Sequence, residues 1–132
     1  MLNHNWRLIL TENISELTNL LRKLEADNSD VQGSAIVSVQ GLPICSALSK
    51  NVNDGIVSAM SAAILSVSER AVQELARGEL KRILIEGVEG LIILSQAGNN
   101  AILATLTKPN PSLGMVFLNI ANVSEQIADL LD

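Results

Sequence analysis

The residues that most often carry out chemistry are few and scattered in this chain. His4 is the only histidine and lies near the N-terminus, where few neighbours would orient it as a general base. Cys45 is the only cysteine, and its apolar and small neighbours are typical of a buried structural thiol. This inventory leaves no Ser/His/Asp or Cys/His pairing away from the chain end and no multi-thiolate metal site. We therefore expect no catalytic residue and no bound metal.

The acidic and glycine-containing motifs are more typical of turns than of catalytic or nucleotide-binding sites. Glu86 and Glu89 flank the turn from Gly87 to Gly90, whereas general acid–base chemistry needs two carboxylates held in an enclosed cleft. The chain has no G-x-x-x-x-G-K-[ST] motif and no G-x-G-x-x-G after a strand, so it lacks the usual loops for nucleotide phosphates. The sequence thus predicts a protein that is not an enzyme and binds no cofactor.

Composition narrows the class of partner. The 132 residues are 48% hydrophobic, 17% charged and 2% aromatic, with a net charge of -5. An acidic chain with so few aromatic side chains is poorly suited to bind nucleic acid through phosphates or stacked bases. A single cysteine and the absence of a secretory pattern in residues 1–10 favour a cytoplasmic protein. The length predicts one domain, which we place at residues 11–132 after an N-terminal extension of residues 1–10.

The apolar pattern predicts eight secondary-structure elements. Apolar residues recur in steps of four and three from Leu10 to Leu24, which indicates an amphipathic helix with Thr11 as its candidate N-cap. A second helix is capped by Asn53 or Asp54, and a third begins near Pro111. Short segments rich in β-branched residues, separated by glycine- and asparagine-containing turns, predict five strands at 33–39, 43–48, 82–86, 91–95 and 101–107.

The element order α-β-β-α-β-β-β-α favours an α+β architecture. Each amphipathic helix must bury its apolar stripe, so the simplest arrangement is a five-stranded antiparallel sheet with helices on both faces. Pro43 lacks an amide donor, which favours an edge position for the second strand. The strand at 82–86 begins the second group of strands, and we expect it at the other edge. No proline or bulge blunts that edge beside Ile83 and Ile85.

The segment 55–68, GIVSAMSAAILSVS, contains no charged residue. An ordinary surface helix carries charges opposite its apolar stripe, but here small residues fill most of that side. We expect the small-residue side to pack against a second helix, most simply one from an identical copy of the chain. Alternatively, the other two helices cover it within a monomer; a membrane span is disfavoured by the short apolar run and its four serines. The stripe comprises Ile56, Met60, Ala63, Ile64, Val67 and Ala71.

A mixed cluster of charges continues from the end of this helix into the next strand. Arg70 and Glu74 stand four residues apart, as is typical of a solvated helix end. Alternatively, Arg70, Arg77 and Arg82 form the polar rim of a protein interface, where charge sets orientation and association rate.

Several short motifs follow one another in the order of a known family. They are Val31 to Val37 (VQGSAIV), Gly41 to Ile44 (GLPI), Ala59 to Ala63 (AMSAA), Glu69-Arg70, Gly78 to Leu80 (GEL), Leu84 to Gly87 (LIEG) and Leu113-Gly114. From about Thr11 to Leu131 the chain resembles the Roadblock/LC7 domain, and in particular its bacterial and archaeal, MglB-like members. The resemblance rests on the order and spacing of these motifs, because none of them is a catalytic signature.

The resemblance implies a profilin-like α/β sandwich with strand order 2-1-5-4-3. It also implies a homodimer in which the third strands pair and the second helices pack together. The residues it places in that dimer interface are Met60, Ala63, Val67, Ile83 and Ile85. In the family, prokaryotic MglB-type regulators bind a small Ras-like GTPase as a dimer and modulate its nucleotide cycle, whereas eukaryotic relatives act as scaffolds. The family offers no general arginine-finger position.

Functions from different classes therefore remain open. The leading hypothesis is a homodimeric module that binds a small Ras-like GTPase and regulates or localises it, without catalytic site or membrane insertion. The second is a structural adaptor that holds a peptide or a motor-complex component independently of nucleotide. A third, a small-molecule sensor of profilin-like architecture, is disfavoured because the chain has few aromatic and convergent polar residues for a ligand pocket.

Overall fold

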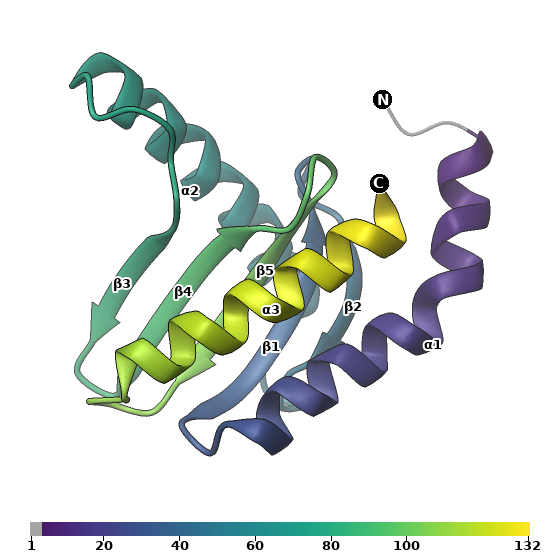
Figure 1. Cartoon of the computed structure of the whole chain (residues 1–132), viewed down its shortest axis with the longest axis horizontal. Helices are drawn as coiled ribbons and strands as arrows, with labels where there is room; N and C mark the ends of the chain where they lie inside the picture. The colour runs from purple at the N-terminus through teal and green to yellow at the C-terminus, as the bar shows by residue number, and fades with distance from the viewer. Residues whose placement is uncertain (1–3) are drawn as a thin grey trace.

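A central antiparallel sheet separates two helical layers (Figure 1). The structure, a computed structural model, describes the backbone of residues 4–132 and the side chains of residues 12–132. Its elements are α1 (His4–Asp27), β1 (Val31–Ser38), β2 (Pro43–Ala47), α2 (Asp54–Glu74), β3 (Ile83–Gly87), β4 (Gly90–Gln96), β5 (Ala101–Thr107) and α3 (Leu113–Leu131). The predicted element order is confirmed.

The strands are hydrogen-bonded in the order β2-β1-β5-β4-β3, as expected. All four pairings are antiparallel, and the long central strands β1 and β5 pair from Val31 opposite Thr107 to Ser38 opposite Ala101. The order leaves β2, with Pro43 at its start, at one edge and β3 at the other. Because successive side chains of a strand point to opposite faces of the sheet, each face has its own hydrophobic core.

The two cores differ in size. On one face, α1 and α3 cover a large cluster that includes Ile36, Ile93 and Leu103. On the other face, α2 alone covers a smaller cluster that includes Val37 and Ile102. Because α2 packs on β1, β2 and β5, whereas α3 packs on β4 and β5, neither helix layer extends fully over β3.

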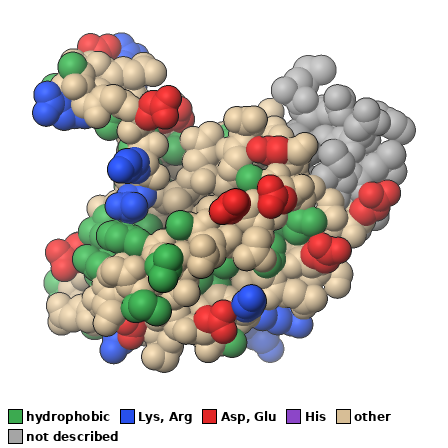
Figure 2. All heavy atoms as spheres, in the orientation of Figure 1, with side chains coloured by type: hydrophobic (Ala, Val, Ile, Leu, Met, Phe, Trp, Pro, Cys, Tyr) green, Lys and Arg blue, Asp and Glu red, His purple; other side chains and the backbone are tan. Residues whose placement is uncertain are grey.

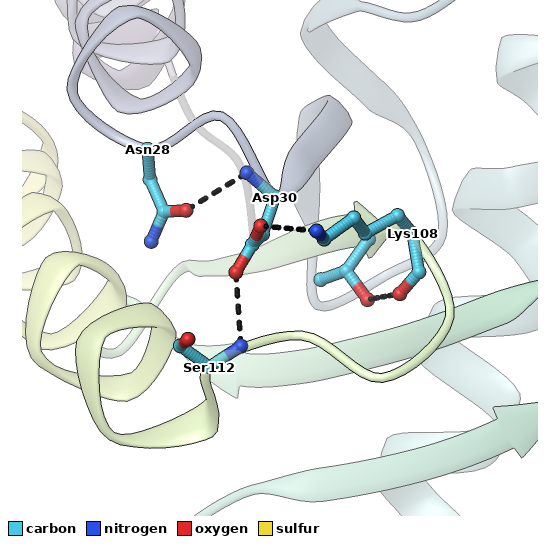
Figure 3. A network of polar contacts seen from close by, with 5 residues as sticks. Asn28, Asp30, Lys108 and Ser112 are labelled. Carbon is cyan, nitrogen blue, oxygen red and sulfur yellow. Dashed lines mark hydrogen bonds and ion pairs between the residues drawn. The ribbon is translucent and has the colours of Figure 1, made fainter.

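A polar network at the N-terminus of α3 connects the α1–β1 loop with the segment between β5 and α3 (Figure 3). The Asp30 carboxylate accepts a hydrogen bond from the Ser112 amide at 2.9 Å and pairs with the Lys108 ammonium at 3.2 Å. The Asn28 carboxamide oxygen accepts from the Asp30 amide at 3.0 Å. The Ser112 amide and the Lys108 ammonium lower the pKa of Asp30, the amide having the larger effect. A carboxylate at the N-terminus of α3 also favours that helix through its dipole.

One predicted helix start is wrong. Thr11 lies inside α1, which already begins at His4, because residues 4–10 contain no proline or glycine to stop a helix. The predicted start of the last helix near Pro111 is confirmed to within two residues, since α3 begins at Leu113. Its N-cap Ser112 makes no side-chain capping bond. The distant Asp30 carboxylate binds the Ser112 amide instead, and no local pattern could show that contact.

Candidate interaction surface

The apolar stripe of α2 faces outward. Ile56, Met60 and Val67 are 57%, 53% and 70% exposed, and Ala63 is exposed beside them. The buried residues of the helix are Ser58, Ser61 and Leu65, which lie on the side toward the sheet. Ile56, Met60 and Val67 are left without cover. Ile64 of the predicted stripe instead packs on the core beneath the helix.

The small residues divide between two environments. Ser58 and Ala62 lie toward the sheet and the β1–β2 turn, whereas Ala59 and Ser66 are exposed. The expected packing of the small-residue side on a second helix stays a prediction.

Close packing at the β1–β2 turn requires small side chains on the adjoining part of α2. The turn between β1 and β2 carries Gly41 at φ +93, and a Cβ there would lie 3.7 Å from the Cα of Ala59 and 3.6 Å from the Cβ of Ala62. The Ser58 hydroxyl donates to the Asp54 carbonyl at 2.7 Å, so it is satisfied within the helix. Small side chains permit this approach between helix and turn, whereas isoleucine or methionine would hold them apart.

The exposed apolar surface continues onto the sheet at its β3 edge. Ile83 is half-buried against the α2-side core, whereas Ile85 is 36% exposed and its cross-strand neighbour Ile92 is 38% exposed. Leu94 belongs to the core on the α2 side, and Ile83 lies directly opposite it on β3. Because side chains two residues apart on a strand point to the same face, Ile85 and Ile92 also point to the α2 side. We call the exposed apolar residues on this side of the molecule the α2–β3 face: Ile56, Met60, Ala63, Val67, Ile85 and Ile92.

The hydropathy of α2 is high for a helix with so little cover. Among the described residues it is the one helix long and apolar enough to cross a membrane by length and composition, with a mean hydropathy of 1.3 over 18 residues. Core helices of soluble proteins share this composition when they are mostly buried, but only 17% of this window is buried. The apolar character of α2 is thus not accounted for by the fold of a single chain.

The predicted charged rim divides between two places. Arg70 pairs with Glu74 at 3.9 Å with both side chains largely exposed, and the Arg77 Nε donates to the Leu75 carbonyl at 2.9 Å. Arg70 lies in the last turns of α2 and Arg77 in the loop that follows it, at the end of the helix that projects beyond the sheet (Figure 1). Arg82 instead lies over the Phe117 ring of α3, 4.2 Å from its centroid.

An open hollow of about 610 Å³ lies beside the projecting end of α2, where Figure 2 shows a waist between that end and the body. Its lining includes Glu69, Gln73, Glu79, Leu80 and Gln96. The side chains come from α2, the following loop and β4, so the hollow exists because the helix overhangs the sheet.

Of the residues first considered for chemistry, Cys45 on β2 and the pair Glu86 and Glu89 at the β3–β4 turn lie in different parts of the sheet. Burial raises the pKa of the Cys45 thiol to about 11, so the thiol is protonated and unreactive near neutral pH. Glu86 and Glu89 are exposed at the β3–β4 turn. The side chain of His4 lies outside the described residues. Among the described residues, no three His, Cys, Asp or Glu side chains gather in a group that could hold a metal ion.

Fold and surface together define a small α/β sandwich with one uncovered apolar helix beside a bare sheet edge. A family model described as the Roadblock/LC7 domain matches residues 17–107. Uncharacterized protein MJ1340 of Methanocaldococcus jannaschii is 33% identical over 97 residues, which are 74% of this chain and 84% of that protein. The chain belongs to the Roadblock/LC7 family, as the order of its motifs predicted.

Solved structures extend the likeness to the fold. The structure described as Myxococcus xanthus MglB superposes with a TM-score of 0.80 at 16% identity, covering 98% of this chain and 92% of that one. LokiProfilin1 superposes with a TM-score of 0.54 at 18% identity, covering 90% and 98% of the two chains. The expected profilin-like sandwich is thereby confirmed.

Proposed function

We propose that this chain is a homodimeric interaction module that binds a small Ras-like GTPase and regulates or localises it, with no catalytic site of its own. The observation that carries the proposal is the α2–β3 face, whose apolar side chains lie uncovered on one side of the sheet. Large apolar side chains left exposed together on one side of a molecule mark an association site.

A second copy of the chain fits this face. A two-fold axis beside β3 would pair the two bare edges into one ten-stranded sheet and bring the two α2 helices together. The partner's α2 would then shelter Met60, Ala63 and Val67, while Ile85 would lie at the strand seam. Ile83 would support the seam from its half-buried position.

We propose a GTPase as the partner because of the family resemblance. The exposed arginines near the α2–β3 face support a charged protein partner. Arg70 at the exposed end of α2 and Arg77 in the following loop are placed where a partner on a two-helix platform would meet them. Charged rims set orientation and association rate more than affinity. Regulation requires that the platform bind the two nucleotide states of the partner with different affinities.

Two measurements on the purified chain test the proposal. Light scattering should give a mass twice 14.1 kDa, and titration of a Ras-like GTPase from the same genome should give different affinities for its GDP and GTP-analogue states. Equal affinities for the two nucleotide states would exclude regulation of the GTPase and favour the adaptor hypothesis, in which binding does not depend on nucleotide. A monomer at micromolar concentration, or a chain that sediments with lipid vesicles through α2, would contradict the dimer.

A further inference from the structure

A second apolar patch lies on the opposite side of β3. Leu84 alternates with Ile83 and Ile85, and it pairs with Ile93, whose side chain belongs to the core under α1 and α3. Leu84 therefore points to the α3 side, yet it is 40% exposed, because α3 packs on β4 and β5. The edge strand is therefore only partly covered on each face, with Ile85 exposed on one and Leu84 on the other.

Side chains of α3 continue this patch. Leu118 is 55% exposed, Leu113 is 38% exposed, and Phe117 is partly buried at the helix flank. Figure 2 shows hydrophobic side chains gathered over the β3 edge and the N-terminal half of α3, with basic side chains directly above them. We call Leu84, Leu113, Phe117 and Leu118 the α3–β3 patch.

Arg82 gives this patch a charge. Its guanidinium lies 4.2 Å from the centroid of the Phe117 ring, a geometry that holds the group in place while leaving its N–H donors free to bind an anion. Among residues 12–132, the ion pairs are Arg70 with Glu74 and Lys108 with Asp30, so Arg82 has no carboxylate partner there. The apolar patch fits apolar side chains of a partner, and the Arg82 guanidinium beside it fits a carboxylate of the same partner.

This inference rests on the proposed function, because the dimer determines how far apart the two α3 helices stand. If two β3 strands pair, the two α3–β3 patches meet across the seam, on the side away from α2. Strands lie about 4.8 Å apart, so helices centred between β4 and β5 of each copy would stand about 19 Å apart. Packed helices lie about 8–10 Å apart, and one further helix fits between them.

We propose that the two α3–β3 patches form a trough that takes one amphipathic helix of a partner protein. The apolar stripe of that helix lies on Leu84 and Phe117 of both copies, and acidic residues on its flanks pair with the two Arg82 guanidinium groups. One helix occupies the trough of each dimer.

The probe is a fluorescein-labelled synthetic helix of about 18 residues with a leucine stripe flanked by glutamates. Anisotropy titration should show one peptide per two chains, and a sister peptide with lysines in place of the glutamates should bind about tenfold more weakly. Arg82→Gln should remove this preference, and Leu84→Ser should weaken both peptides about tenfold. Met115→Ser is the matched control, since Met115 is 53% exposed on α3 and lies outside the patch.

The outcomes separate this inference from the proposed function. A chain that scatters as a dimer but does not bind the peptide overturns the trough alone, as does one peptide per chain or binding unchanged by Arg82→Gln and Leu84→Ser. A monomeric chain overturns the dimer and the trough together. Sedimentation with phosphatidylcholine and phosphatidylglycerol vesicles that Leu84→Ser abolishes would identify a lipid surface as the occupant and overturn the helix.

Discussion

At the residue scale, Gly90 is the glycine at which an added Cβ would come nearest to a backbone atom. Its φ of +153 suits glycine, and a Cβ there would overlap the carbonyl oxygen of Thr107 on the neighbouring strand. Gly90→Ala should therefore lower the free energy of unfolding by about 3 kcal/mol, measured by urea denaturation. Gly114→Ala is the matched control: a Cβ there meets no atom within 4 Å, so in a helix it should stabilise by about 0.5 kcal/mol. Equal effects of the two changes would contradict this account.

At the element scale, the strands were easier to predict than the packing of α2. Glycine and asparagine turns bounded β3, β4 and β5 to within about a residue, since turn chemistry is local. The direction of the α2 stripe was not predictable from its own residues, because Met60 and Val67 look like core residues on a helical wheel. Their exposure accompanies the close approach of Gly41 to Ala59 and Ala62, a contact between distant segments that no local pattern shows.

The start of α3 depends on a contact that a pH titration can test. The pKa of Asp30 is lowered by the Ser112 amide and then by Lys108, so its carboxylate stabilises the fold above its unfolded pKa of about 4. This contribution is lost as the pH falls through the lower, folded pKa. Asp30→Asn should be less stable than the wild type at pH 7, and the difference should shrink toward pH 3.

Urea unfolding followed by circular dichroism at pH 7, 5 and 3 measures this difference. Asp27→Asn serves as the control, because Asp27 is an exposed carboxylate at the end of α1, near Asp30 but outside the network of Figure 3. A destabilisation by Asp30→Asn that stays constant over the whole pH range would show that the carboxylate charge does not act on α3.

At the scale of the whole molecule, the two methionines of equal exposure separate association from folding. Met60 on α2 and Met115 on α3 are both 53% exposed, so glutamate at either position costs the isolated chain little. In the proposed dimer, Met60→Glu places an unpaired charge in a buried seam at a cost of about 3–5 kcal/mol. Sedimentation should then show monomers for Met60→Glu and dimers for Met115→Glu and the wild type.

Thermal unfolding supplies the complementary measurement, because a dimer that unfolds to separate chains gains stability with concentration. Each tenfold rise in concentration should add about 1.4 kcal/mol per dimer. The Tm of the wild type and of Met115→Glu should therefore rise with concentration, whereas the Tm of Met60→Glu should stay constant. A wild-type Tm that does not depend on concentration, together with a monomeric mass, would mean that α2 keeps its apolar stripe for a different partner.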